Sequence, residues 1–148
     1  MILLIQPDDF LLNYVFFLEK KTNVIINGVF TKICFSNDCM IMNGIFINVP
    51  FHPFIKRFQS KNILFEPDSN RELIEKLSHI EECLLDYYTL SYNVLNKTPV
   101  FSLKTAFSTG IVKYYKSTSA KYQKYYIKIS GVWETATEFG LTYKMIEY

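Results

Sequence analysis

The side chains best suited to chemistry lie in a segment without carboxylates, from Tyr87 to Trp133, which contains seven lysines and eleven aromatic residues. Residues 1–98 have a net charge of −2, from nine basic and eleven acidic side chains. Residues 99–148 have a net charge of +4, from seven basic and three acidic ones. Lysine neutralises phosphate, and an aromatic ring offers a face on which an unpaired base stacks, contributing about 1–3 kcal/mol per base. This combination predicts a surface that binds single-stranded nucleic acid.

We expect the lysines of this segment to contact phosphates and its aromatic rings to stack on bases. The candidate residues are Lys104, Lys113, Tyr114, Tyr115, Lys116, Lys121, Tyr122, Lys124, Tyr125, Lys128 and Trp133. Lysine suits binding without sequence preference because it is a mobile point charge, whereas arginine, the usual reader of guanine, occurs only twice in the chain. Residues 113–122 are the most loop-like part, and we interpret them as a basic arm that becomes ordered on the strand. If about five to seven lysines contact phosphate, the logarithmic salt slope is about −3.5 to −5.

A structural explanation competes with this one. In a β-rich domain most aromatic side chains lie in the core, and lysines that alternate with apolar residues can form an ordinary solvated face of a sheet. The aromatic residues of the segment would then be divided, with about half of them buried.

Other kinds of site have less support in the sequence. Cys34, Cys39 and His52 are too few for a structural zinc site, which needs four ligands, so we expect no metal and no other cofactor. Phosphate-binding glycine loops and the common hydrolase and zinc-protease motifs are missing from the sequence. Glu134 and Glu138 could form an acid–base or metal-binding pair, but a solvated turn explains them better. We therefore do not expect an enzyme.

The elements that would position these residues are mainly strands. The strand-like segments are residues 23–30 leading into 33–35 as the first strand, then 40–49, 63–65, 125–133 and 140–148. Residues 10–18 are so apolar that they fit a short buried helix or a buried strand equally well. Gly28 and Gly44 fall where a bulge or bend is expected.

One amphipathic helix is predicted between the third and fourth of these strands. It begins with a capping box in which Ser69 is the N-cap and Glu72 the third helical residue. It runs to about Tyr88, with a possible extension to Leu95. Its solvent face is expected to carry Glu75, Lys76, Glu81, Glu82 and Asp86. Three strands, a helix and two strands is the order of a five-stranded OB-type β-barrel, and 148 residues suit a single domain spanning 1–148.

The C-terminal part of the chain carries a resemblance to a known group of proteins. Residues 127–133 read IKISGVW and residues 140–144 read GLTYK. This run resembles the ending of the OB-fold single-stranded DNA-binding proteins of large cytoplasmic DNA viruses and phages. Together with the small size of the chain, it also resembles the single-strand binders of yeast linear killer plasmids. The similarity covers about 20 of the 148 residues.

The resemblance implies a protein that coats displaced single-stranded DNA during replication and that works beside other replication proteins. Members of this group often end in an acidic tail that recruits partners, whereas this chain ends KMIEY. We therefore do not expect recruitment through a tail.

Two alternatives from other functional classes stay open. The chain could be a structural or assembly protein of a virus or plasmid, with aromatic residues at interfaces between copies, or a small RNA-binding factor. A homo-oligomer is compatible with any of these. Three cysteines form an odd set that indicates reduced thiols and a cytoplasmic site, either the host cell cytoplasm or a viral replication site. No apolar run approaches the roughly 18–20 residues that a membrane span needs, and the start is too short for a signal peptide.

Overall fold

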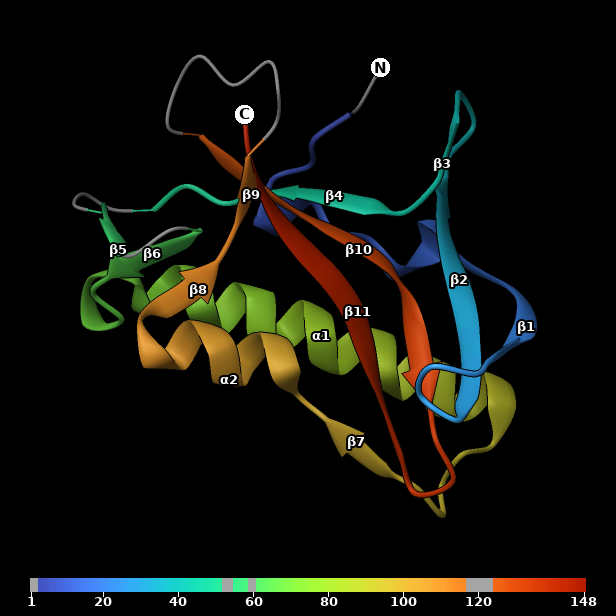
Figure 1. Ribbon diagram of the computed structural model, residues 1–148. Helices are drawn as coiled ribbons and strands as arrows, with labels where there is room; N and C mark the ends of the chain where they lie inside the picture. Colours follow the sequence, from blue (N-terminus) through green and yellow to red (C-terminus); the bar gives the residue numbers. More distant parts are fainter. Residues whose placement is uncertain (1–2, 52–54, 59–60, 117–123) are drawn as a thin grey trace.

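The computed structural model describes residues 3–51, 55–58, 61–116 and 124–148 (Figure 1). Short 3-10 helices occupy η1 (Pro7–Asp9), η2 (Leu12–Tyr14) and η3 (Asp68–Asn70), and the α-helices are α1 (Arg71–Tyr92) and α2 (Ser102–Thr109). The strands are β1 (Val15–Asn23), β2 (Gly28–Ser36), β3 (Ile41–Met42), β4 (Ile45–Asn48), β5 (Ile55–Phe58), β6 (Asn62–Phe65), β7 (Thr98–Val100), β8 (Ile111–Lys113), β9 (Tyr115–Lys116), β10 (Tyr125–Glu134) and β11 (Glu138–Glu147). The chain is therefore mainly β with one long helix, as predicted.

The main sheet is mixed and has eight strands, with β10 and β11 at its centre. Its central order is β1-β2-β10-β11-β7, and β3, β4 and β9 pair with β2, β10 and β11 respectively. β7 and β9 run parallel to β11, whereas the other pairs are antiparallel. A smaller sheet has the order β5-β6-β8.

The closed barrel that we expected is not found among the described strands. The path of the main sheet ends at β1 on one side and at β7 on the other, so its two edges do not meet. The helix also does not follow a third strand, because β1 to β6 all precede α1 in the described residues. The order of apolar runs alone could not show that the N-terminal half is divided into so many short strands.

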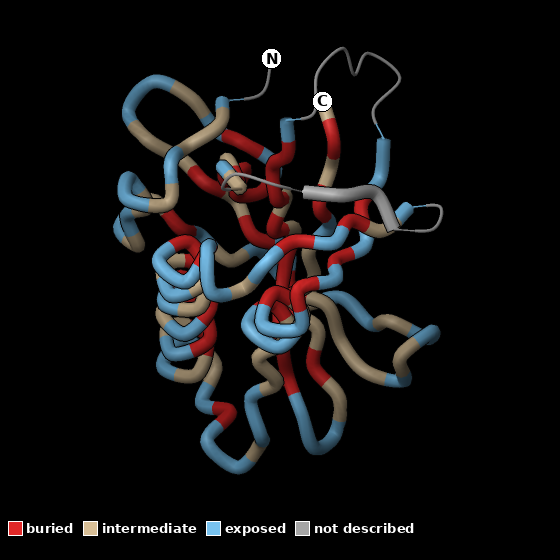
Figure 2. Tube along the Cα trace, turned by 90° about the vertical axis from the view of Figure 1, so that its left-hand side faces the viewer, coloured by how far each residue is buried: buried red, intermediate tan, exposed pale blue. Residues whose placement is uncertain are grey.

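The two faces of the main sheet have different environments. The inner face carries buried side chains such as Ile127, Ile129 and Met145, and these belong to the same core as Leu77 and Leu84 of α1. In Figure 2 the buried parts of the chain gather between the helices and the strands. The residues that alternate with these buried ones along β10 and β11 lie on the outer face and point away from both helices.

A bulge in β10 decides which side chains reach the outer face. The register with β11 shifts between Ile129 and Gly131, so Ser130 is the extra residue. Before the bulge Lys128 is on the outer face, and after it Val132 is buried while Trp133 is on the outer face. Without the bulge, Val132 would point outward and Trp133 would point into the core.

α1 begins and ends close to the predicted positions. Its N-cap is Asn70 rather than Ser69, because residues before it form η3. It ends at Tyr92, where Asn93 adopts a left-handed conformation with a φ of 52°. α2 was not predicted, since its eight residues lie inside the lysine- and aromatic-rich segment. No helix in the described parts of the chain is long and apolar enough to span a membrane.

Candidate nucleic-acid interface

An exposed ring with two lysines lies on the outer face of the main sheet. The Nζ atoms of Lys113 and Lys144 lie 5.2 and 5.1 Å from the ring centroid of Tyr115, which is 40% exposed. Tyr115 reaches this place because β9 pairs in parallel with the end of β11, where it is opposite Ile146. Cation–π contact holds both ammonium groups at the surface without neutralising them.

Lys128 adds a third cation. It is directly opposite Lys144 in the β10–β11 register, and its Nζ lies 5.6 Å from the ring centroid of Phe46 on β4. We call Lys113, Tyr115, Lys128 and Lys144 the lysine–tyrosine cluster. None of its three lysines forms an ion pair with a carboxylate among the residues that the structure describes. The cluster is therefore an uncompensated positive site.

Three lysines elsewhere in the fold, Lys20, Lys76 and Lys97, are each paired with a carboxylate. Lys76 on α1 lies 3.0 Å from carboxylate oxygens of both Asp8 and Glu72, and this raises its pKa. Lys20 and Lys97 both bind Glu134. The three lysines of the lysine–tyrosine cluster differ from these, because none of them is paired with a described carboxylate.

The prediction that Tyr114 and Tyr125 stack on bases is wrong. Tyr114 is 7% exposed and Tyr125 is 2% exposed, and their rings meet edge to face with centroids 5.9 Å apart. Tyr125 also packs against Phe51, which stacks on Phe107 of α2. Tyr125 is at an inner position of β10, like Ile127 and Ile129, so it lies in the core and has no free face for a base.

The other predicted residues do not form one group. Lys104 is exposed on α2, which packs against α1 and the inner face of the sheet, so the structure separates it from the lysine–tyrosine cluster. Lys116 is exposed within β9, and Lys124 is exposed immediately before β10. Lys121 and Tyr122, and with them most of the expected basic arm, lie outside the described residues. Trp133 is half-buried on the outer face.

Sequence reasoning missed several cations on the outer face. Lys144 belongs to the cluster, and Lys21 and Lys32 are exposed on β1 and β2. Lys32 is opposite Gly131 of β10. The signal that could have found them is alternation along β2. Phe30 and Lys32 alternate with the buried residues of this strand and therefore lie on its opposite face. Charge balance does not point to Phe30 and Lys32, because they lie in residues 1–98, which have a net negative charge.

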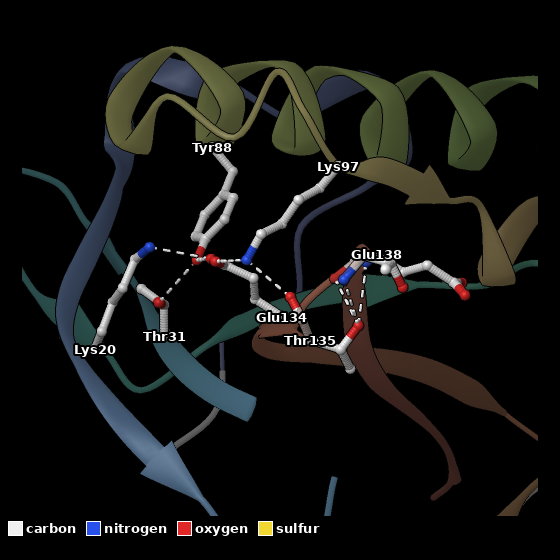
Figure 3. A network of polar contacts seen from close by, with 8 residues as sticks. Lys20, Thr31, Tyr88, Lys97, Glu134, Thr135 and Glu138 are labelled. Atoms are coloured by element: carbon white, nitrogen blue, oxygen red, sulfur yellow. Dashed lines mark hydrogen bonds and ion pairs between the residues drawn. The ribbon is translucent and has the colours of Figure 1, made fainter. Parts of the chain in front are cut away.

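A buried polar network lies on the inner face, at the end of β10 (Figure 3). Glu134, with 8% of its side chain exposed, accepts hydrogen bonds from Tyr88 at 2.6 Å, from Lys20 at 3.0 Å and from Lys97. Lys97 also donates to the carbonyl of Thr135 at 2.8 Å. The interpretation of Glu134 as part of a solvated turn is therefore wrong, whereas Glu138 is exposed.

The network keeps Glu134 ionised. Burial opposes its charge, but hydrogen bonds from Lys97, Tyr88 and Lys20 outweigh that effect and hold its pKa at about 2. Burial and the bond to Glu134 raise the pKa of Tyr88. The contacts join Glu134 of β10 to β1, to α1 and to the segment that precedes β7. They therefore fix the sheet against the helix. This carboxylate therefore acts as a structural anchor.

A second carboxylate is buried on α1, against expectation. Glu81 is fully buried, and its oxygens accept the N–H groups of Leu103 at 2.8 Å and Lys104 at 3.0 Å. The N-cap of α2, Phe101, supplies no side-chain cap, so Glu81 takes that role from another helix. Burial raises the pKa of Glu81, while burial and the nearby Glu81 raise the pKa of Tyr143 to about 12.

Cys34, Cys39 and Cys83 are free thiols, and His52 lies outside the described residues. In the part of the chain that the structure describes, no group of three or more His, Cys, Asp or Glu side chains could hold a metal ion.

No protein-family model, curated protein or solved structure matches this chain.

Proposed function

We propose that this chain is a sequence-nonspecific single-stranded DNA-binding protein and that the lysine–tyrosine cluster is a contact site for the strand. In this proposal it coats and protects displaced strand during replication of a viral or plasmid DNA. The observation that carries the proposal is the lysine–tyrosine cluster, in which two uncompensated lysines contact the exposed ring of Tyr115 and a third, Lys128, lies directly opposite one of them. A polynucleotide supplies both of the partners that this site lacks, an anion for the lysines and a flat base for the ring.

The same geometry supports binding without sequence preference. Lys113 and Lys144 approach Tyr115 as point charges, and neither presents the rigid fork with which arginine reads a base edge. Stacking on a tyrosine tolerates any base, because every base has a π-face. The protein would therefore hold the strand through its backbone and its ring faces, and it would perform no chemistry on it.

The proposal does not require an OB-type barrel. Binders of single strands combine a positively charged surface that follows the backbone with rings that stack on bases. An open sheet provides both when cations and rings share its outer face, as Lys128, Lys144 and Tyr115 do here. The resemblance to OB-fold binders in residues 127–144 covers most of β10 and most of β11, the strands that carry two of these lysines.

Binding of a fluorescent oligothymidylate at 50 and 200 mM salt tests the proposal. Three phosphate contacts give a logarithmic slope of about −2, so affinity should fall about 20-fold over this range. The triple variant Lys113→Gln, Lys128→Gln, Lys144→Gln should lose most of this salt dependence. Lys104→Gln is the matched control, because Lys104 is exposed like Lys113 and Lys144 but lies on α2.

Two results would contradict the proposal. If oligothymidylate does not bind, or binds without salt dependence, an assembly role in which the rings form contacts between copies becomes the better explanation. If an RNA oligomer of the same base sequence competes much more strongly than DNA, the ligand is RNA, and the assignment to DNA fails while the cluster stands as a contact site.

A further inference from the structure

A second pair of rings lies on the outer face, at the other end of β10. Trp133 is directly opposite Phe30 of β2 on one side and Gly140 of β11 on the other. A Cβ atom built on Gly140 would come within 2.8 Å of the Trp133 ring, and one built on Gly131 would collide with the ring of Phe30. The two glycines therefore leave room for both rings to lie against the backbone of the sheet. Both rings are partly exposed.

An apolar hollow with two cations lies beside one of these rings, that of Phe30. It has a volume of about 410 Å³ and is lined by Leu18, Glu19, Lys21, Phe30 and Lys32. Lys21 is opposite Phe30 in the β1–β2 register, and Lys32 is opposite Gly131 in the β2–β10 register. Both lysines are exposed, and neither pairs with a carboxylate among the described residues, Glu19 included. An apolar body with negative charge at its edge would complement Leu18, Phe30 and the two lysines.

We infer that Phe30 and Trp133 form a base-stacking platform, with Lys21 and Lys32 as its phosphate contacts, and that the same nucleic-acid strand crosses both this platform and the lysine–tyrosine cluster. This inference rests on the proposed function. A nucleotide has the required chemistry, because its base is flat and largely apolar on its faces while its phosphate is anionic. Lysines beside the hollow would attract the phosphates that flank a stacked base.

The spacing between the platform and the lysine–tyrosine cluster fits one continuous strand. Lys128 and Trp133 are both on the outer face of β10, five residues apart in sequence. Because Ser130 is the extra residue of the bulge, the two positions are only four residues apart along β11, from Gly140 to Lys144, which is about 13 Å at roughly 3.3 Å per residue. That length covers about four stacked nucleotides at roughly 3.4 Å each. A strand that stacks its bases along both sites therefore needs about four nucleotides or more, which is within the roughly 4–16 nucleotides that one small binding domain covers.

Because Trp133 is the only tryptophan of the chain, its fluorescence reports on the platform alone. We expect oligothymidylate of about 20 nucleotides to quench it on binding, because the base stacks on the indole. An oligomer of about three nucleotides is too short to span both sites, and it should bind much more weakly. The salt slope measured with the long oligomer supplies a second readout.

Two sets of variants separate stacking from charge. The double variant Lys21→Gln, Lys32→Gln removes two phosphate contacts, so the slope for the long oligomer should become less steep by about 1.4. Lys104→Gln should leave the slope unchanged. Phe30→Leu should weaken binding, and Phe30→Tyr should restore it because a ring is retained. If Phe30 only covers Gly131, the Phe30→Leu substitution should change the stability of the protein without changing the affinity of the folded protein for the oligomer.

The failure of this inference differs from the failure of the proposed function. One outcome is that the long oligomer binds with strong salt dependence, does not change Trp133 fluorescence, and gives the same salt slope with the Lys21→Gln, Lys32→Gln variant. In that case the platform is overturned and the lysine–tyrosine cluster remains. If the long oligomer does not bind at all, both fall. Because the fluorescence measurement uses the unmodified chain, a variant that fails to fold does not prevent the test.

Discussion

Lys128 and Lys144 face each other directly across β10 and β11, with both side chains on the outer face of the sheet. Like charges in this arrangement repel, and such a pair destabilises the sheet by an amount on the order of 0.2–1 kcal/mol. Each ammonium group contacts a ring, Phe46 or Tyr115, and neither forms an ion pair with a described carboxylate. The fold therefore tolerates a local repulsion that an anionic ligand would relieve.

We expect Lys144→Glu to stabilise the free protein while weakening its binding to oligothymidylate. The new carboxylate would face Lys128 and replace a repulsion with an attraction, which should raise the free energy of unfolding by about 0.5 kcal/mol. Urea unfolding and salt-dependent binding measure the two effects. Lys144→Gln should give an intermediate stability. Lower stability of the Lys144→Glu variant would contradict the repulsion, and unchanged affinity would contradict the role of Lys144 in binding.

Glu134→Gln should destabilise the protein strongly. The substitution removes the charge that balances Lys20 and Lys97 and weakens the 2.6 Å bond from Tyr88. Two ammonium groups are then left partly buried without a counter-ion, which should lower the free energy of unfolding by about 2 kcal/mol. Glu138→Gln, at an exposed position near the same turn, should change it by less than about 0.5 kcal/mol. Equal effects of the two variants would mean that the network contributes little.

The pKa of Glu134 predicts a second, pH-dependent effect. Because the folded-state pKa of about 2 lies below the usual value of 4.5, this carboxylate contributes stability that is present above pH 4.5 and lost as the pH falls toward 2. The loss in this range should be about 2–3 kcal/mol. Glu81 acts with the opposite sign, since its raised pKa makes its ionisation costly in the folded state. The measurement is therefore the difference between the original chain and Glu134→Gln in urea unfolding from pH 5 to pH 2. A difference that does not shrink over this range would contradict the assignment.

Periodicity predicted those elements whose pattern is local. The spacing of Leu73, Leu77 and Leu84 indicated α1, and the apolar alternation after Leu141 indicated β11. The same pattern could not place Glu81 inside, because its burial depends on α2 presenting free N–H groups to α1. The many short strands before α1 were not resolved for a similar reason, since their ends are set by pairing with distant segments.

The candidate site was predicted in part. The absence of carboxylates from Tyr87 to Trp133 located the region that contains Lys113, Tyr115 and Lys128. It could not separate the exposed Tyr115 from the buried Tyr125, because both lie among lysines and differ only in the face of the sheet to which they belong. That face depends on long-range pairing and, for Trp133, on the bulge at Ser130.

Glu81→Ala should destabilise the protein through α2 rather than through α1. Alanine fits the interior of α1, but the N–H groups of Leu103 and Lys104 would lose their acceptors at a buried helix start. An unsatisfied buried donor costs about 1–3 kcal/mol, so we expect a fall of about 2 kcal/mol in the free energy of unfolding. Hydrogen exchange should show faster exchange of α2 amides, with α1 little changed. Glu82→Ala, at the exposed neighbouring position, is the matched control. If it has the same effect as Glu81→Ala, or if exchange rises in α1 instead, Glu81 does not cap α2.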